Sequence, residues 1–210
     1  MVPSSATANV GKSERTAVEP GVLPGEVAYT SVEVAEAVER VQSGAWLIPD
    51  FQREFVWKPY QLAAFADSLW RNYPVGSLLL WAAPLETGHR ASATLWIADG
   101  QQRLTALGLL MGRRPSWWPP HRWESKVLRK YQLFVNVEVP ESPFRLGCHP
   151  ASVIQAPSPF VPLRELLELV WQPRETVEKE LRSKAERLKG AGLCSGQSVE
   201  SVAFFLASVI

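Results

Sequence analysis

The 210-residue chain contains little cysteine and no long apolar run. Its two cysteines, Cys148 and Cys194, lie far apart and match no CxxC or cysteine–histidine spacing, which argues against a disulfide scaffold and against structural zinc. No stretch approaches the length of a membrane span, and the first residues lack the apolar region of a signal peptide. These absences predict a cytoplasmic protein with no membrane partner.

The chain also lacks an excess of charge of either sign. Lysine plus arginine number 22 against 21 for aspartate plus glutamate, so no overall field favours nucleic acid or a membrane surface. With 46% hydrophobic residues the chain can form a core, which excludes global disorder. Tryptophan is abundant, with nine residues, and we expect Trp70, Trp81 and Trp96 in core elements.

Composition and periodicity predict three regions. Residues 1–26 are rich in small and polar residues without periodicity, which indicates a disordered tail. Residues 27–172 should form one α+β domain with a small mixed sheet flanked by helices. Residues 173–210 should begin a helical region, and its apolar end without a polar tail suggests a piece of a longer protein.

Helix and strand patterns alternate along the predicted domain. Thr30 and Glu33 match a capping box for a helix that Gly44 ends, and Pro59 suits the first turn of a second helix. The other predicted elements are buried strands at 77–81 and 94–98, a strand with one covered face at 132–139, and helices at 162–171, 174–189 and the C-terminus.

Asp99-Gly100-Gln101-Gln102-Arg103 joins the strand at 94–98 directly to a helix. The first N–H groups of a helix have no acceptor within it and attract anions. Gly100 lets a phosphate approach the backbone, Arg103 offers a bidentate donor, and Asp99 could hold Mg²⁺ or orient a water. This set suits a nucleotide polyphosphate. The alternative is that Asp99 caps the helix while Arg103 pairs with a surface carboxylate.

A second motif, residues 48–57, repeats this chemistry. Gln52 and Arg53 again combine an amide with a guanidinium. Phe51, Phe55 and Trp57 could stack on a base or form an apolar wall. The alternative is that Arg53 pairs with a carboxylate and that Phe55 and Trp57 belong to the core.

The proline-rich stretch 112–130 should be irregular and is locally basic, with six basic residues against one acidic. Its charge could follow a DNA backbone while its indoles stack on bases, and the alternative is a surface loop that packs its indoles on the domain. A mark such as a phosphorothioate is softer than a phosphate, so an apolar wall beside Arg53 could prefer it. The candidate DNA or mark-sensing residues are Phe51, Arg53, Phe55, Trp57, Arg113, Arg114, Trp117, Trp118, Arg122 and Trp123.

Together the two motifs resemble a known family. The spacing of IP.FQR.FVW, a helix containing Asp67-Ser68-Leu69, then YPVGSLLLW and IADGQQRLTAL is similar to the N-terminal domain of the GmrSD and SspE family of modification-dependent restriction endonucleases. The resemblance runs from about Thr30 to about Glu168 and includes YQLFVNVEV and FVPLREL.

The resemblance implies a fold like that of the ParB and sulfiredoxin group, in which a GxxR turn at a helix N-terminus holds nucleotide phosphates. It implies nucleoside triphosphate hydrolysis with Mg²⁺, GTP being the expected nucleotide with the base left open. Catalysis would fall on Asp99, Gln102 and Arg103, with Asp99 at the metal. Nucleotide binding would fall on Gln52, Arg53, Gly100, Gln101, Gln102 and Arg103.

The family also implies DNA, possibly modified, as a partner. Its members usually carry a C-terminal nuclease domain with histidine and asparagine residues around a metal, and these 210 residues contain nothing similar. The leading hypothesis is therefore a nucleotide-hydrolysing regulatory domain of an anti-phage restriction protein. The alternative is a domain that senses a DNA modification without hydrolysis. An interaction scaffold with an inactive nucleotide site is a third reading, which the intact Asp99, Gln102 and Arg103 disfavour.

Overall fold

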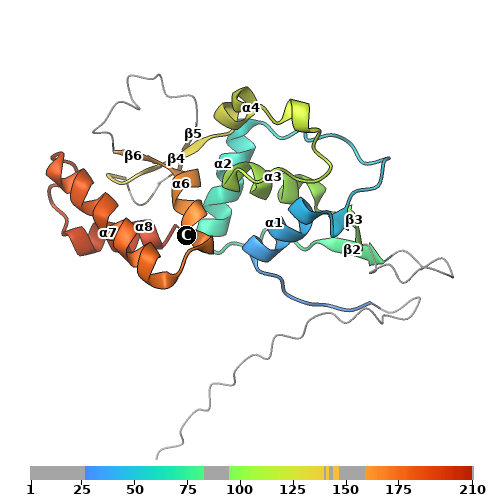
Figure 1. Ribbon diagram of the computed structural model, residues 1–210, viewed down its shortest axis with the longest axis horizontal. Coiled ribbons are helices and arrows are strands. Elements are labelled where there is room, and N and C mark those ends of the chain that lie inside the picture. Colours follow the sequence, from blue (N-terminus) through green and yellow to red (C-terminus); the bar gives the residue numbers. More distant parts are fainter. Residues whose placement is uncertain (1–26, 83–94, 140, 142–143, 147–158, 210) are drawn as a thin grey trace, which may run out of the picture.

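The computed structural model describes residues 27–82, 95–139, 141, 144–146 and 159–209 (Figure 1). The predicted tail, residues 1–26, lies outside these ranges. The first half contains α1 (Val34–Ser43), β1 (Trp46–Leu47), α2 (Pro59–Trp70), β2 (Leu79–Ala82), β3 (Leu95–Asp99) and α3 (Gln101–Met111). The second half contains the 3₁₀ turn η1 (Pro120–Arg122), α4 (Ser125–Lys130), β4 (Leu133–Asn136), β5 (Phe144–Leu146), β6 (Phe160–Pro162), α6 (Leu163–Leu167), η2 (Glu168–Trp171), α7 (Arg174–Gly190) and α8 (Val199–Ala207).

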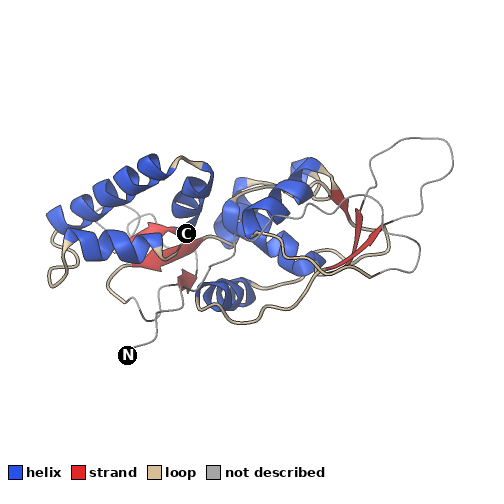
Figure 2. Cartoon of the chain, turned by 90° about the horizontal axis from the view of Figure 1, so that it is seen from below, coloured by secondary structure: helices blue, strands red, loops and turns tan. Residues whose placement is uncertain are grey.

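The strands form two small sheets. In the first, with order β1-β3-β2, β1 runs parallel to β3 and β2 runs antiparallel to it. In the second, with order β5-β4-β6, both pairings are antiparallel. Figure 2 shows the two sheets toward opposite ends of the molecule with helices between and around them. The α+β class and the small mixed sheet are confirmed, whereas the likeness to ParB and sulfiredoxin stays a prediction.

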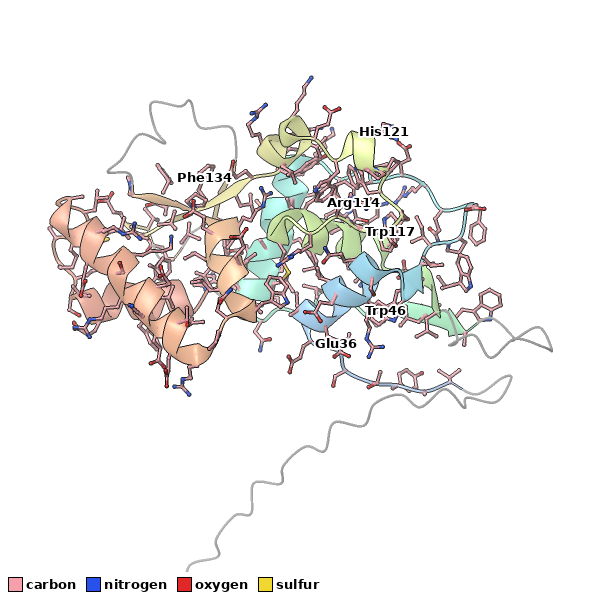
Figure 3. All side chains as sticks on the ribbon, in the orientation of Figure 1. Glu36, Trp46, Arg114, Trp117, His121 and Phe134 are labelled. Atoms are coloured by element: carbon pink, nitrogen blue, oxygen red, sulfur yellow. The ribbon has the colours of Figure 1, made fainter. Side chains whose placement is uncertain are left out.

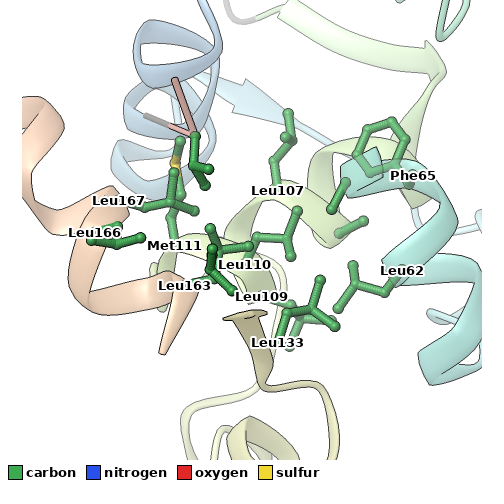
Figure 4. Packing of buried hydrophobic residues seen from close by; sticks show 14 of the residues in the cluster. Leu62, Phe65, Leu107, Leu109, Leu110, Met111, Leu133, Leu163, Leu166 and Leu167 are labelled. Atoms are coloured by element: carbon green, nitrogen blue, oxygen red, sulfur yellow. The ribbon is translucent and has the colours of Figure 1, made fainter. Parts of the chain in front are cut away.

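Helix α3 lies at the centre of the core. From Leu104 to Met111 every residue is buried, because a leucine-rich helix can bury its whole circumference when other elements surround it. Leu62 and Phe65 of α2 pack toward one side of α3, and Leu163, Leu166 and Leu167 of α6 lie toward the other (Figure 4). The N-terminal end of this buried helix carries the DGQQR motif.

Helices α7 and α8 belong to the same core. Leu181 and Ala185 of α7 and Val202 and Leu206 of α8 are buried members of one hydrophobic cluster that also contains residues of α1, α2 and α3. Burying this area stabilises the fold by about 25 cal/mol per Å² of apolar surface. The segment after residue 172 is therefore packed against the domain that precedes it.

The structure corrects several expectations. Helix α1 begins at Val34 after Glu33, and the Thr30 hydroxyl donates to the carbonyl of Ser31, too far from the helix to cap it. Residues 125–130 form α4 within the stretch expected to be irregular. All four residues of β4 are buried, because it is the central strand of its sheet and both of its faces are covered.

The expectation that β2 is a buried strand and that Trp81 lies in the core is wrong. Leu79 and Trp81 are 59% and 55% exposed. The reason is topological, since β2 is an edge strand and pairs only with β3 among the described residues. Trp70 and Trp96 are half-buried and pack less deeply than Trp46, which is buried.

Within the described ranges, none of the helices has both the length and the apolar character needed to cross a membrane.

Candidate functional site

A pocket of about 310 Å³ lies where the two sequence motifs meet. Residues from the segment before α2, from α2 itself, from the turn before β2 and from the start of α3 surround it. The lining residues are Gln52, Arg53, Trp57, Phe65, Ser68, Pro74, Val75, Asp99, Gly100, Gln101, Gln102 and Arg103. The fold therefore brings together the two sequence motifs, although 46 positions separate Gln52 from Ala98 at the end of β3.

The N-terminus of α3 supplies free hydrogen-bond donors to this pocket. Gly100 is the N-cap residue with φ +100°, a left-handed conformation that favours glycine, and its carbonyl accepts the N–H of Leu104 at 3.0 Å. The N–H groups of Gln101, Gln102 and Arg103 have no acceptor among the described residues. These donors and the positive end of the helix dipole favour an anion.

Arg103 is fixed by two contacts. Its Nη1 donates to the carbonyl oxygen of Val75 at 2.9 Å, and its Nη2 donates to Oδ2 of Asp99 at 2.9 Å. The Arg103 side chain is 19% exposed and that of Asp99 is 73% exposed. Arg103 thus pairs with a carboxylate, as the alternative interpretation proposed, but the partner is the aspartate of its own motif, and Asp99 does not cap the helix.

The two glutamines of the DGQQR motif form hydrogen bonds with the backbone of the second motif. Gln101 is buried, and its Nε2 donates to the carbonyl oxygen of Arg53 at 2.9 Å. Nε2 of Gln102 donates to the carbonyl oxygen of Glu54 at 3.1 Å, while its Oε1 accepts the N–H of Val56 at 3.0 Å. These side chains tie residues 53–56 to α3.

The second motif, residues 48–57, contributes one side-chain amide and one cation to the pocket. Gln52 donates from Nε2 to the carbonyl oxygen of Ala98 at 3.1 Å. Arg53 is exposed, and among the described residues its guanidinium has no ion pair and no side-chain hydrogen bond. The pairing that the alternative interpretation proposed for Arg53 is absent there, so its charge is available to a ligand.

Trp57 lines the pocket, whereas Phe51 and Phe55 do not. Phe55 packs in an aromatic cluster with ring centroids 6.1 Å from Trp57, 6.1 Å from Trp118 and 5.6 Å from Tyr131. The Tyr131 hydroxyl donates to the carbonyl oxygen of Trp57 at 2.8 Å, which anchors this cluster. Phe51 is 85% exposed and so is the one phenylalanine of this motif that is open to a partner.

The indoles of the basic stretch pack on the domain. Trp117 donates from Nε1 to Oγ1 of Thr105 at 3.3 Å and lies next to α3, with Arg114 nearby (Figure 3). Trp118 and Trp123 pack edge to face with centroids 5.3 Å apart. All three indoles are half-buried against the core, which fits the surface-loop alternative better than stacking on bases.

The arginines of this stretch also have partners within the protein. Arg113 lies over the ring of Trp171, 4.6 Å from its centroid, and Arg114 donates to the carbonyl oxygen of Trp118 at 2.6 Å. Arg122 makes a bidentate pair with Glu54, at 2.6 and 3.2 Å. That pair lowers the pKa of Glu54 from its ordinary value through the hydrogen bond and charge of Arg122. The local positive charge is therefore partly neutralised.

The described residues contain no cluster of three or more histidine, cysteine or acidic side chains that could hold a metal by themselves. Asp99 is the acidic residue of the pocket, and one or two carboxylates together with substrate phosphates are the usual ligands of Mg²⁺. The site therefore fits an ion that arrives with a polyphosphate. Phe65, Ser68, Pro74 and Val75 also line the pocket. Ser68, Pro74 and Val75 lie in segments that carry the family resemblance, but sequence reasoning assigned none of the four to the site, because their side chains have no charge that would indicate a phosphate contact.

Comparison with known proteins identifies the family of the chain. The family model for the GmrSD restriction endonuclease, N-terminal domain, matches residues 34–189, which include both motifs and all the pocket residues. No curated protein and no solved structure gives a significant match. Because the family model covers more than half of the chain, the protein belongs to the GmrSD family as an N-terminal domain of this type of restriction endonuclease.

Proposed function

We propose that the pocket binds and hydrolyses a nucleoside triphosphate, and that this reaction regulates a restriction protein acting on DNA. The observation that carries the proposal is the convergence of the free N–H groups of α3 and two arginines, Arg53 and Arg103, on one pocket. Backbone donors and arginines around one cavity are the groups that recognise phosphates. A GmrSD-type domain would then act through a C-terminal nuclease domain.

In this proposal each residue has a role that follows from the chemistry of its side chain or backbone. The N–H groups of Gln101, Gln102 and Arg103 and the guanidinium of Arg103 would hold the phosphate oxygens. Arg53 would stabilise the charge that develops on the transferred phosphoryl group, because preorganised donors are most effective where charge increases in the transition state. Asp99 would orient the attacking water or, with the nucleotide, hold Mg²⁺. When bound, that ion would neutralise part of the phosphate charge.

The apolar side of the pocket suits a nucleoside. Trp57 and Phe65 meet edge to face with centroids 5.3 Å apart, and Pro74 and Val75 extend this wall. Aromatic faces of this kind stack on any base, so they supply affinity without choosing among bases. GTP is our expected substrate on family grounds, and the wall itself is compatible with each of the four nucleotides.

Phosphate release from GTP, UTP, CTP and ATP tests the proposal, with wild type compared with Arg103→Ala and Arg53→Ala. We expect release with at least one nucleotide in wild type and a loss of about 10²-fold or more in each variant, which is typical when one transition-state donor is removed. Asp67→Asn is the matched control, since Asp67 pairs with Arg71 outside this pocket. Equal background release in all proteins would contradict the proposal.

A second candidate function, sensing of a DNA modification, rests on Phe51. This exposed ring lies two residues before Arg53, which is also exposed and has no ion pair among the described residues, so an apolar and a cationic group are close in the chain and open to solvent. Binding of phosphorothioate-bearing and plain duplexes at two salt concentrations, with wild type and Phe51→Ala, tests it. If the mark makes no difference to wild type, the sensing function is excluded and only nonspecific charge remains.

A further inference from the structure

We propose that Gln101 and Gln102 are positioning residues, which fix the backbone of residues 53–56 so that Arg53 is held ready at the pocket. In this role the glutamines hold residues 53–56, the strip, and do not contact the ligand. That the ligand is a polyphosphate rests on the proposed function. Both glutamines line the pocket, and neither needs to touch phosphate for this role.

The hydrogen bonds show how the strip is held. Gln102 uses both ends of its amide, donating to the carbonyl oxygen of Glu54 and accepting from the N–H of Val56. It therefore pairs with the backbone as a neighbouring strand would. Gln101 is 5% exposed and donates to the carbonyl oxygen of Arg53 itself. Three hydrogen bonds to the strip therefore come from the first turn of α3, the same turn that offers N–H groups to an anion.

The other side chains of the strip point to different partners, and this leaves Arg53 dependent on the backbone. Glu54 pairs with Arg122, and Phe55 packs among Trp57, Trp118 and Tyr131. Arg53 has no described side-chain partner of its own. Its place at the pocket is therefore determined by its own backbone, whose carbonyl Gln101 holds.

Fixing a cation before the ligand arrives increases affinity, because less conformational freedom is lost on binding. A typical net hydrogen bond of this kind corresponds to about fivefold in an equilibrium constant. We therefore expect Gln102→Met, which keeps the length of the side chain and removes two hydrogen bonds, to weaken tripolyphosphate binding by up to about 30-fold. Gln101→Met removes one hydrogen bond and should weaken it by about fivefold.

A double-mutant cycle separates positioning from direct contact. Tripolyphosphate affinity is measured for wild type, Gln102→Met, Arg53→Ala and the double variant. If Gln102 acts through Arg53, the Gln102→Met change costs nothing further once Arg53 is alanine. Additive losses would overturn the inference, because they would mean that Gln102 contacts the ligand itself or only supports the fold. Gln61→Met is the matched control, since Gln61 accepts the N–H of Lys58 outside the pocket.

Amide hydrogen exchange tests the strip without any ligand. In Gln102→Met the N–H of Val56 should exchange faster than in wild type, while the amides of α3 from Leu104 onward keep their protection. Unchanged exchange at Val56 would overturn the inference whether or not a polyphosphate binds. Failure of wild type to bind tripolyphosphate would instead refute the proposed function and the ligand part of the inference, so the two failures are distinguishable.

Discussion

Arg103 lies 2.9 Å from the carboxylate of Asp99, four residues earlier in the chain, across the N-terminus of α3. A phosphate that enters the pocket must share this guanidinium with Asp99 or displace it. The pair therefore lowers the net positive charge of the pocket while it holds Arg103 in a fixed place beside Val75. Substituting Asp99 alone therefore shows how much its carboxylate opposes the binding of a phosphate to Arg103.

Asp99→Asn should strengthen metal-free binding of tripolyphosphate while weakening nucleotide hydrolysis in Mg²⁺. The exposed carboxylate no longer competes for Arg103, and an exposed pair is worth up to about 1 kcal/mol, or about fivefold in affinity. Calorimetry with and without Mg²⁺, together with phosphate release, measures both effects. Asp67→Asn, which breaks the comparable pair with Arg71, should change neither. Weaker metal-free binding by Asp99→Asn would contradict competition for Arg103.

Gly100→Ala should destabilise the protein and impair the pocket. Gly100 has φ +100°, and a Cβ there would lie 2.3 Å from Cδ2 of Leu78 and 3.5 Å from Nη2 of Arg103. A non-glycine residue in such a conformation costs about 1–3 kcal/mol. Thermal or denaturant unfolding gives the loss directly. Gly190→Ala, at the end of α7 with nothing within 4 Å of the new Cβ, should be neutral or slightly stabilising. Similar stabilities for Gly100→Ala and wild type would mean that the turn has another conformation in solution.

Trp118→Ala should lower the free energy of unfolding by about 2–4 kcal/mol, because it removes a half-buried indole that contacts Phe55 and Trp123. Denaturant unfolding measures this effect. Phe51→Ala, which truncates a side chain that is 85% exposed, should change stability by less than about 0.5 kcal/mol. If Trp118→Ala left stability unchanged and weakened DNA binding instead, the indole would be a nucleic-acid contact and not a packing residue.

The pairing of Glu54 with Arg122 should make part of the stability depend on pH in the acid range. The pKa of Glu54 is lowered in the folded protein from its ordinary value of 4.5, chiefly by the hydrogen bond from Arg122. A lowered carboxyl pKa contributes stability that is fully present above the ordinary value and is lost as pH falls through the lower, folded-state value. The melting temperature of wild type should therefore exceed that of Glu54→Gln at neutral pH, and the difference should disappear in acid below 4.5.

Two observations would check this pH effect. High salt should reduce the difference between the proteins, because both side chains are exposed. Glu124→Gln, which changes an exposed glutamate without a described ion pair, should show no comparable pH-dependent difference. A wild-type advantage that persists unchanged to low pH would mean that the carboxylate charge of Glu54 does not contribute.

Local sequence was enough to predict the features that depend on a few neighbouring residues. Pro59 begins α2, Gly44 ends α1, and Gly100 turns β3 into α3, because proline and glycine restrict or free the backbone at their own positions. Such local signals, together with their spacing, were also enough to predict the DGQQR turn, the second motif with Gln52 and Arg53, and the family of the chain.

Tertiary structure alone decided what each of these side chains does. Gln101 and Gln102 contact partners that lie 46 to 48 residues away in the chain, and Glu54 pairs with Arg122 at a separation of 68. Trp81 is exposed because β2 is an edge strand, whereas Trp117 and Trp118 pack on a core that residue order does not reveal. The sequence specifies which groups are present and how the backbone turns beside them. Only long-range packing determines which amides and charges meet, because a hydrogen bond or ion pair depends on distances that the folded chain creates.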